Sequence, residues 1–222
     1  MNESDFLANI ARKLGRPQPL TAIPPRSVVG APDFWSVREL PLPERIERFQ
    51  QELEKLGGQV TVYNHLSSLK AGLADLLSTL QPRRVGTWGG NALAAFELDD
   101  VLAPYDTIGW REGALAAFEQ VDVGITGCAY AVADTGTLVM KSDPWRGRSV
   151  SVLPTVHVAL VQSNQVFTRL GEVLEELAKE RACMASSVHF ITGPSRSSDI
   201  ENDQTIGIHG PAAVHVLMLH EA

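Results

Sequence analysis

The chain has 222 residues and a formal net charge of −7, and 44% of its residues are hydrophobic. A chain of this length and composition can bury a core without disulfides or structural metal. The negative charge disfavours nucleic acid as a partner, because neutralising phosphates takes clustered Lys and Arg side chains.

The two cysteines, Cys128 and Cys183, form no CxxC pair. Four thiolates for an iron–sulfur cluster are therefore not available from this chain, and a Cys-based zinc site is disfavoured as well. The first residues, MNESDFLANIARKLG, lack the basic start and apolar run of a signal peptide. No apolar stretch approaches the roughly 20 residues that a membrane-spanning helix needs. We expect a cytoplasmic protein with no membrane span, no metal and no cofactor of its own.

The first predicted element is a short amphipathic helix that Ser4 caps and Gly15 ends, with apolar residues at helical spacing from Phe6 to Leu14. It either packs on its own domain or serves as an arm that binds a partner. Residues 16–43 carry seven prolines and predict an extended linker. We therefore divide the chain into an N-terminal helix with a Pro-rich linker, 1–43, and an α/β domain, 44–222.

From Glu44 onward the predicted elements alternate between helix and strand. The predicted helices span 44–56, 66–80, 111–120 and 165–181. The predicted strands span 60–63, 84–87, 121–126, 137–141, 155–162, 188–192 and 214–219. This alternation predicts an α/β fold with a mainly parallel sheet and helices on both of its faces.

Glycine-bearing segments follow several of these strands. They are TWGG at 87–90, TGCAYAVADTGT at 126–137 and TGPSRSSD at 192–199. In parallel α/β sheets, ligands bind beyond the carboxyl ends of the strands. The positions of these segments therefore predict a ligand site built from glycine loops.

The segment ADTGT, residues 133–137, has the chemistry of an anion-receiving turn. Gly136 permits a positive φ and a close approach, while Thr135 and Thr137 offer hydroxyl groups beside successive backbone N–H donors. Asp134 is a candidate acid–base group. A plain turn between two strands is the alternative interpretation.

The segment TGPSRSSDIE, residues 192–201, offers a second set of donors. Gly193 begins an irregular loop, Ser195 and Ser198 supply hydroxyls, and Arg196 supplies a planar fork that suits carboxylate or phosphate. Glu201 is a further acid–base candidate. The alternative is a capped surface turn with a solvated arginine.

Histidines are the remaining candidates for chemistry. His209 lies between two glycines in GIHGP, residues 207–211, where it could serve as an acid–base group near neutral pH. His157 alternates with valines in a predicted strand, which also fits a satisfied sheet histidine. No metal-binding, dinucleotide, P-loop or GxSxG signature is present.

Taken in order, DVGITGCAYAVADTGTLVM, LPTVHVALV, ITGPSRSSDIE and GIHGP resemble the lactate-utilization protein C family (LutC/YkgG) of the LUD-domain group. The resemblance implies the fold shared by glucosamine-6-phosphate deaminase, ribose-5-phosphate isomerase and CoA-transferases. It also implies iron–sulfur companion proteins that carry the clusters and, together with this chain, support oxidation of L-lactate to pyruvate.

The combined interpretation is a component of a lactate-oxidising system. A small carboxylate or phosphate would bind at Thr135, Gly136, Thr137, Gly193, Ser195, Arg196 and Ser198. Two alternatives stay open. One is a free-standing isomerase or CoA-transferase-like enzyme that uses Asp134, Glu201 or His209 on a sugar phosphate or acyl-CoA. The other is a non-catalytic assembly subunit.

Overall fold

The fold is taken from a computed structural model that describes residues 2–20, 22, 39–111, 115–198 and 204–220. Residue contacts divide the chain into two units, Met1–Arg38 and Glu39–Ala222. The first contains helix α1, Glu3–Lys13, whose N-cap is Asn2 rather than the expected Ser4. The Asn2 side chain accepts a hydrogen bond from the Asp5 backbone N–H at 2.8 Å, which satisfies one of the open donors of the first turn.

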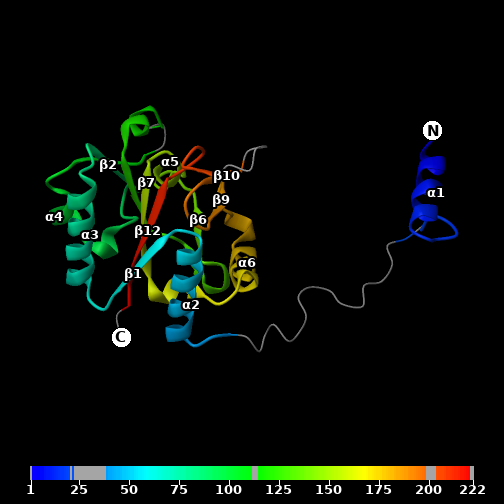
Figure 1. Cartoon of the computed structure of the whole chain (residues 1–222), viewed down its shortest axis with the longest axis horizontal. Helices are drawn as coiled ribbons and strands as arrows, with labels where there is room; N and C mark the ends of the chain where they lie inside the picture. Colours follow the sequence, from blue (N-terminus) through cyan, green and yellow to red (C-terminus); the bar gives the residue numbers. More distant parts are fainter. Residues whose placement is uncertain (1, 21, 23–38, 112–114, 199–203, 221–222) are drawn as a thin grey trace. The chain divides into compact units, whose positions relative to one another are not determined.

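Among the described residues, the strands lie in the second unit (Figure 1). The strands of the large sheet are β1 Gln59–Tyr63, β2 Arg84–Thr87, β3 Asp106–Gly109, β4 Val123–Thr126, β7 Val156–Gln162 and β12 Ala213–Leu219. Those of a smaller sheet are β5 Tyr130–Val132, β6 Thr137–Lys141, β8 Val166–Phe167 and β9 Val188–Ile191. The pair β10 Arg196–Ser198 and β11 Gln204–Ile206 forms a separate antiparallel ladder.

The large sheet has the strand order β1-β12-β7-β4-β2-β3, and every pairing in it is parallel. Its central strands read as continuous apolar runs, and every residue of β4 is buried. Strands that are buried on both faces need such runs, because neither face meets water. The smaller sheet, β8-β5-β6-β9, pairs β6 antiparallel to both β5 and β9.

Helices cover both faces of the large sheet. They are α2 Leu42–Lys55, α3 Leu66–Leu80, α4 Asp99–Leu102 and α5 Ser149–Val152. A further helix, α6 Leu170–Lys179, packs on the smaller sheet, where its Val173 and Leu177 share a core cluster with Val132 and Val139. In Figure 1, α3 and α4 lie on one side of the sheet, and α2 and the smaller sheet lie on the other. The face opposite α3 also receives α5 at Gly124, where a Cβ would collide with the carbonyl oxygen of Val150. The predicted α/β fold with a mainly parallel sheet and helices on both faces is therefore confirmed.

The differences from the predicted elements have local causes. Strand β3 and the short strands β5 and β8 were not predicted, because a run of two to four residues carries little periodicity of its own. The helix expected over 111–120 is a 3₁₀ turn, Leu115–Gln120, and residues 112–114 lie outside the described residues. The helix expected from Gln165 begins only at Leu170, after a short 3₁₀ turn and β8.

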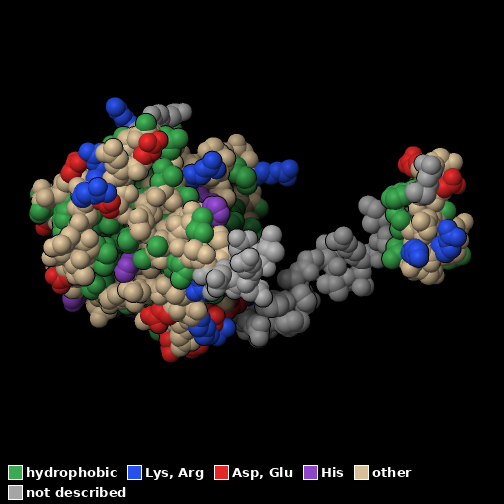
Figure 2. Space-filling model, turned by 45° about the horizontal axis from the view of Figure 1, so that its top comes forward, with side chains coloured by type: hydrophobic (Ala, Val, Ile, Leu, Met, Phe, Trp, Pro, Cys, Tyr) green, Lys and Arg blue, Asp and Glu red, His purple; other side chains and the backbone are tan. Residues whose placement is uncertain are grey.

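Charged side chains are distributed over the surface of the described residues, as expected for a composition without charge runs. On the face shown in Figure 2, acidic and basic side chains are interspersed among apolar and other ones. In the part of the chain that the structure describes, every helix is too short or too polar to cross a bilayer.

Candidate functional site

Three glycine-bearing loops that lie far apart in the sequence meet in the structure. We call residues 133–137, 192–196 and 207–211 the loop cluster. The backbone N–H of Ser195 donates to the Pro211 carbonyl at 2.9 Å, and the N–H of Gly207 donates to the Ser195 carbonyl at 2.9 Å. The second and third loops are therefore bonded to each other. The first loop joins them through its threonines.

A chain of hydroxyl groups links the first two loops. The Oγ1 atoms of Thr135 and Thr137 lie 2.7 Å apart, and the Oγ1 atoms of Thr137 and Thr192 lie 2.9 Å apart. Thr137 is buried, whereas Thr135 and Thr192 are exposed. The hydroxyl chain thus runs from a buried centre to two ends that solvent can reach, where hydroxyls can donate to an anion.

The loop cluster is built against the carboxyl-terminal half of α2. Gly136 has φ +58°, and a Cβ there would collide with the backbone of Leu53. A Cβ on Gly193, which has φ +104°, would lie 3.1 Å from the Leu56 carbonyl oxygen. The predicted positive φ at Gly136 is confirmed, and the close neighbour in this structure is a helix.

Arg196 lies at the end of the same helix. Its Nη2 donates to the carbonyl oxygen of Leu56, the residue that caps α2. The last carbonyls of a helix have no partner within it, and a cation is favourable there. A guanidinium has five N–H donors. Arg196 is exposed, so this one bond positions its fork at the surface of the loop cluster.

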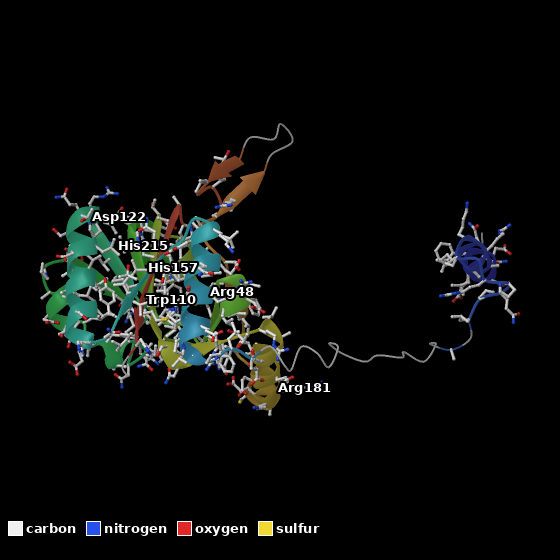
Figure 3. The ribbon with its side chains drawn as sticks, turned by 60° about the horizontal axis from the view of Figure 1, so that its bottom comes forward. Arg48, Trp110, Asp122, His157, Arg181 and His215 are labelled. Atoms are coloured by element: carbon white, nitrogen blue, oxygen red, sulfur yellow. The ribbon has the colours of Figure 1, made fainter. Side chains whose placement is uncertain are left out.

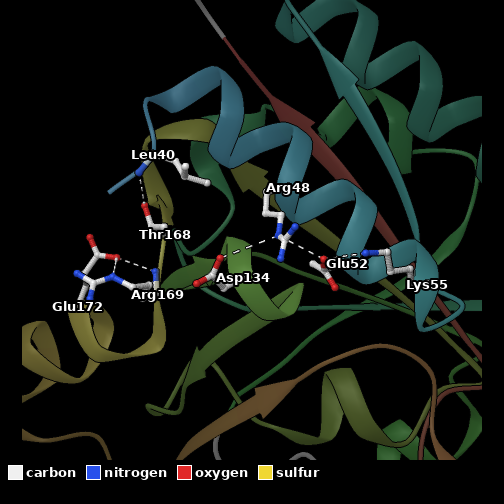
Figure 4. Close-up of polar contacts among 8 residues, drawn as sticks. All are labelled: Leu40, Arg48, Glu52, Lys55, Asp134, Thr168, Arg169 and Glu172. Atoms are coloured by element: carbon white, nitrogen blue, oxygen red, sulfur yellow. Dashed lines mark hydrogen bonds and ion pairs between the residues drawn. The ribbon is translucent and has the colours of Figure 1, made fainter. Parts of the chain in front are cut away.

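The structure describes two of the three acid–base candidates, Asp134 and His209. Asp134 is turned toward α2, where its Oδ1 lies 4.0 Å from Nε of Arg48, and Arg48 also pairs with Glu52 at 3.3 Å (Figure 4). His209 is exposed on its loop. Glu201 lies outside the described residues, as does Asp199, and the side chain of Ser198 is not described. The predicted site residues therefore stay a prediction.

His157 is a buried partner of Thr126 in the large sheet. Its Nε2 lies 2.8 Å from Thr126 Oγ1, and burial, with a smaller contribution from the charge of nearby His189, lowers its pKa to about 3. Figure 3 shows His157 and His215 within the sheet, and the register places them on opposite faces of neighbouring strands. Burial also lowers the pKa of His215. His157 is therefore neutral at physiological pH and belongs to the core.

A concavity lies at the carboxyl ends of β2, β4 and β7. Its volume is about 350 Å³, and its lining includes Trp88, Phe96, Cys128, Lys141, Arg146 and Leu160. We call it the carboxyl-edge pocket. Burial raises the pKa of Cys128 to about 12, so its thiol stays protonated and is a poor nucleophile. Lys141 and Arg146 belong to no recognisable motif, whereas the TWGG segment after β2 and the start of TGCAYAVADTGT after β4 both contribute to this edge.

Metal binding finds no geometric support in the described ranges. No group of three or more His, Cys, Asp or Glu side chains among them is arranged to hold a metal ion.

Comparisons with known proteins agree on one family. Residues 46–219 match the LUD domain. Lactate utilization protein C from Halalkalibacterium halodurans is 30% identical over 93% of this chain and 92% of its own length. The protein of the same name from Exiguobacterium is 28% identical over 99% and 96%. The crystal structure of a DUF162 family protein from Deinococcus radiodurans has a TM-score of 0.62 at 22% identity, and covers 81% of this chain and 99% of its own. The chain therefore belongs to the LUD domain family, in the group of lactate utilization protein C.

Proposed function

We propose that this chain is a component of a cytoplasmic lactate utilization system that supports oxidation of L-lactate to pyruvate, and that it binds a small carboxylate at the loop cluster. Iron–sulfur companion proteins would carry the electrons, and this chain would hold no cluster. The main support is its similarity to proteins named lactate utilization protein C over more than nine-tenths of its length.

The geometry of the loop cluster supplies the chemistry for such a site. Arg196 would engage the carboxylate with its planar fork, while the helix carbonyl at Leu56 holds that fork in place. The exposed hydroxyl of Thr135 would donate to the second carboxylate oxygen or to the substrate hydroxyl. Its orientation is set by the chain of hydroxyl groups that runs through Thr137 to Thr192. A preorganised arginine loses less entropy on binding than a free one.

The test compares Arg196→Gln with a matched control. Arg181→Gln changes an exposed arginine beyond the end of α6, and Figure 3 shows Arg181 at that end of the molecule, away from the labelled core residues. A charge-assisted hydrogen bond contributes about 1.5–3 kcal/mol, so Arg196→Gln should weaken L-lactate binding roughly 10- to 100-fold in calorimetry. Growth on L-lactate should fall with it.

The control variant should bind and grow like the wild type. Equal L-lactate affinity and equal growth for Arg196→Gln and the wild type would show that the ligand does not use this arginine. Co-purification with the iron–sulfur companions, measured in the same strains, separates a binding defect from a failure of assembly.

A role in assembly is a second candidate, and one observation favours it. Phe6, Leu7, Ile10 and Leu14 of the first unit are each at least 40% exposed, which leaves an apolar stripe on the surface of α1 (Figure 2). Deleting residues 1–40 should then abolish co-purification with the companion proteins while leaving L-lactate affinity unchanged. Unaltered co-purification would rule out α1 as the docking element.

A further inference from the structure

The carboxyl-edge pocket lies where three neighbouring parallel strands end. Trp88 follows β2, Gly127 follows β4, and Gln162 is the last residue of β7; all three residues line the cavity. These strands are adjacent in the order β7-β4-β2. This edge of a parallel α/β sheet is where ligands bind most often.

The charge of the lining is positive. Lys141 and Arg146 line the cavity, and none of its described lining residues is an Asp or Glu. Tyr130 also lines it, and burial together with the nearby Glu180 carboxylate raises the pKa of its phenol. Cys128 is likewise protonated. The ionised groups of the lining are therefore two cations, which favour an anionic ligand.

Each cation contacts one carboxylate outside the lining and one aromatic ring of the lining. The Nζ of Lys141 lies 2.7 Å from Glu180 Oε2 and 5.5 Å from the centre of the Tyr130 ring. The guanidinium of Arg146 lies 5.8 Å from the Trp88 ring centre, and its Nε is 3.4 Å from Asp143. An ammonium has three N–H donors and a guanidinium five, so these contacts orient the cations without using all their donors.

The other part of the lining is apolar. Ala92, Ala95, Phe96 and Leu160 line the cavity beside the indole of Trp88. The Trp88 Nε1–H is buried and has no acceptor among the described residues, which is uncommon in native proteins. A cavity with cations and an apolar aromatic wall fits a ligand with two chemically different ends.

The cavity is larger than lactate. Lactate displaces roughly 120 Å³, about four water volumes at ~30 Å³ each. The cavity measures about 350 Å³, so lactate would leave most of the apolar wall uncovered.

We propose that the carboxyl-edge pocket binds an organic carboxylate with a flat apolar arm, its head group at Lys141 and Arg146 and its arm along Trp88 and Phe96. This site is separate from the loop cluster and does not depend on the function proposed for that region. Because burying an aromatic ring stabilises a complex by about 1.5–3 kcal/mol, such a ligand should bind roughly 10- to 100-fold tighter than lactate does in this pocket.

The experiment titrates the purified full chain with 3-phenyllactate by calorimetry, and compares it with L-lactate in the Arg196→Gln variant, in which the clamp proposed for the loop cluster is removed. Arg146→Gln should weaken 3-phenyllactate binding tenfold or more. Ala95→Trp fills the apolar end from an exposed position, so it should remove the advantage of the aromatic acid and leave the fold intact. Arg196→Gln in the loop cluster should leave the affinity for 3-phenyllactate within twofold of the wild type.

A measurement on the unmodified chain guards against misfolded variants. The indole N–H resonance of Trp88, assigned with Trp88→Phe, should shift on addition of 3-phenyllactate. No binding of 3-phenyllactate at about 10 mM, or an unmoved Trp88 resonance, would overturn the proposal. So would an affinity that is unchanged by both Arg146→Gln and Ala95→Trp, or one that is lost in Arg196→Gln.

Discussion

The loop cluster and the carboxyl-edge pocket lie at opposite ends of one β-hairpin. Strand β5 starts at Tyr130 in the pocket and runs to the ADTGT turn, and β6 returns from Thr137 to Lys141 in the pocket. Four residues of strand span about 13 Å. The same short hairpin therefore supplies hydroxyls to one region and a cation to the other.

The two regions differ in what their polar groups contact. In the loop cluster, the threonine hydroxyls bond to one another and Arg196 bonds to the end of α2. In the pocket, Lys141 and Arg146 meet carboxylates from outside an open cavity. Removing a group from the loop cluster should therefore affect folding as well as binding, whereas changes in the pocket should affect mainly binding.

The largest expected effect is at Gly136. Gly136→Ala places a Cβ against the Leu53 backbone in a residue with φ +58°, so we expect a loss of about 3 kcal/mol in the free energy of unfolding. Gly171→Ala is the control, because no atom lies within 4 Å of its added Cβ in α6. It should be neutral or stabilise by up to about 1 kcal/mol. Equal urea midpoints for the two variants would contradict the tight packing of the loop cluster on α2.

The second prediction concerns pH and the sheet beside the pocket. The pKa of His157 in the folded chain, about 3, lies below its ordinary value of 6.5, so the unfolded chain takes up the proton first as the pH falls. The contribution of neutral His157 to the free energy of unfolding is therefore complete above about pH 6.5 and is lost as the pH falls toward 3. Between pH 7 and pH 5 the loss is about 2 kcal/mol. Urea unfolding at the two pH values measures it.

His157→Gln should remove most of that pH dependence, because glutamine does not titrate. His215→Gln is the matched control, since His215 lies on the opposite face of the next strand and is only half-buried. His215→Gln should remove a smaller part of the pH dependence of the free energy of unfolding. If the wild type and His157→Gln lose stability equally between pH 7 and pH 5, His157 is not the group responsible.

These regions also show what the sequence could and could not predict. Helix 66–80 and strands 84–87 and 137–141 were predicted with the bounds that the structure has, because their apolar patterns and turn residues are local signals. The assignment of 137–141 and 188–192 to a second, antiparallel sheet depends on pairing between distant segments. Local pattern carries no information on such pairing.

The same contrast applies to the sites. Gly136 and Gly193 can be recognised in the sequence as sites of a positive φ, because glycine adopts a positive φ at little cost. Both residues have a positive φ in the structure. Lys141 and Arg146 look like ordinary surface cations in the sequence. Only the fold brings them to one cavity with Trp88. The glycines of the loop cluster could therefore be singled out from the sequence, whereas the two cations of the pocket could not.

A smaller effect is expected at the centre of the loop cluster. Thr137→Val keeps the shape but removes the buried hydroxyl that joins Thr135 and Thr192, at a cost of about 1 kcal/mol. Thr107→Val is the control, because Thr107 is exposed and its hydroxyl bonds only within its own segment, at 3.3 Å. It should stay within about 0.5 kcal/mol of the wild type. If Thr137→Val is as stable as Thr107→Val, the chain of hydroxyl groups does not contribute to the stability of the fold.

The smallest effect is expected at Glu180, and it separates the two regions most directly. Glu180 bonds to Lys141, and this ammonium lowers the pKa of the Glu180 carboxyl below its ordinary value, so it is ionised at neutral pH and competes with a ligand anion for Lys141. Glu180→Gln should therefore tighten 3-phenyllactate binding by about two- to threefold at low salt, with less gain at high salt because screening weakens both attractions. The affinity of the loop cluster for L-lactate should not change, because Glu180 contacts none of its residues among the described contacts. Weaker binding of 3-phenyllactate would instead mean that Glu180 is needed to hold Lys141 at the cavity, and the affinity at two salt concentrations decides between the two roles.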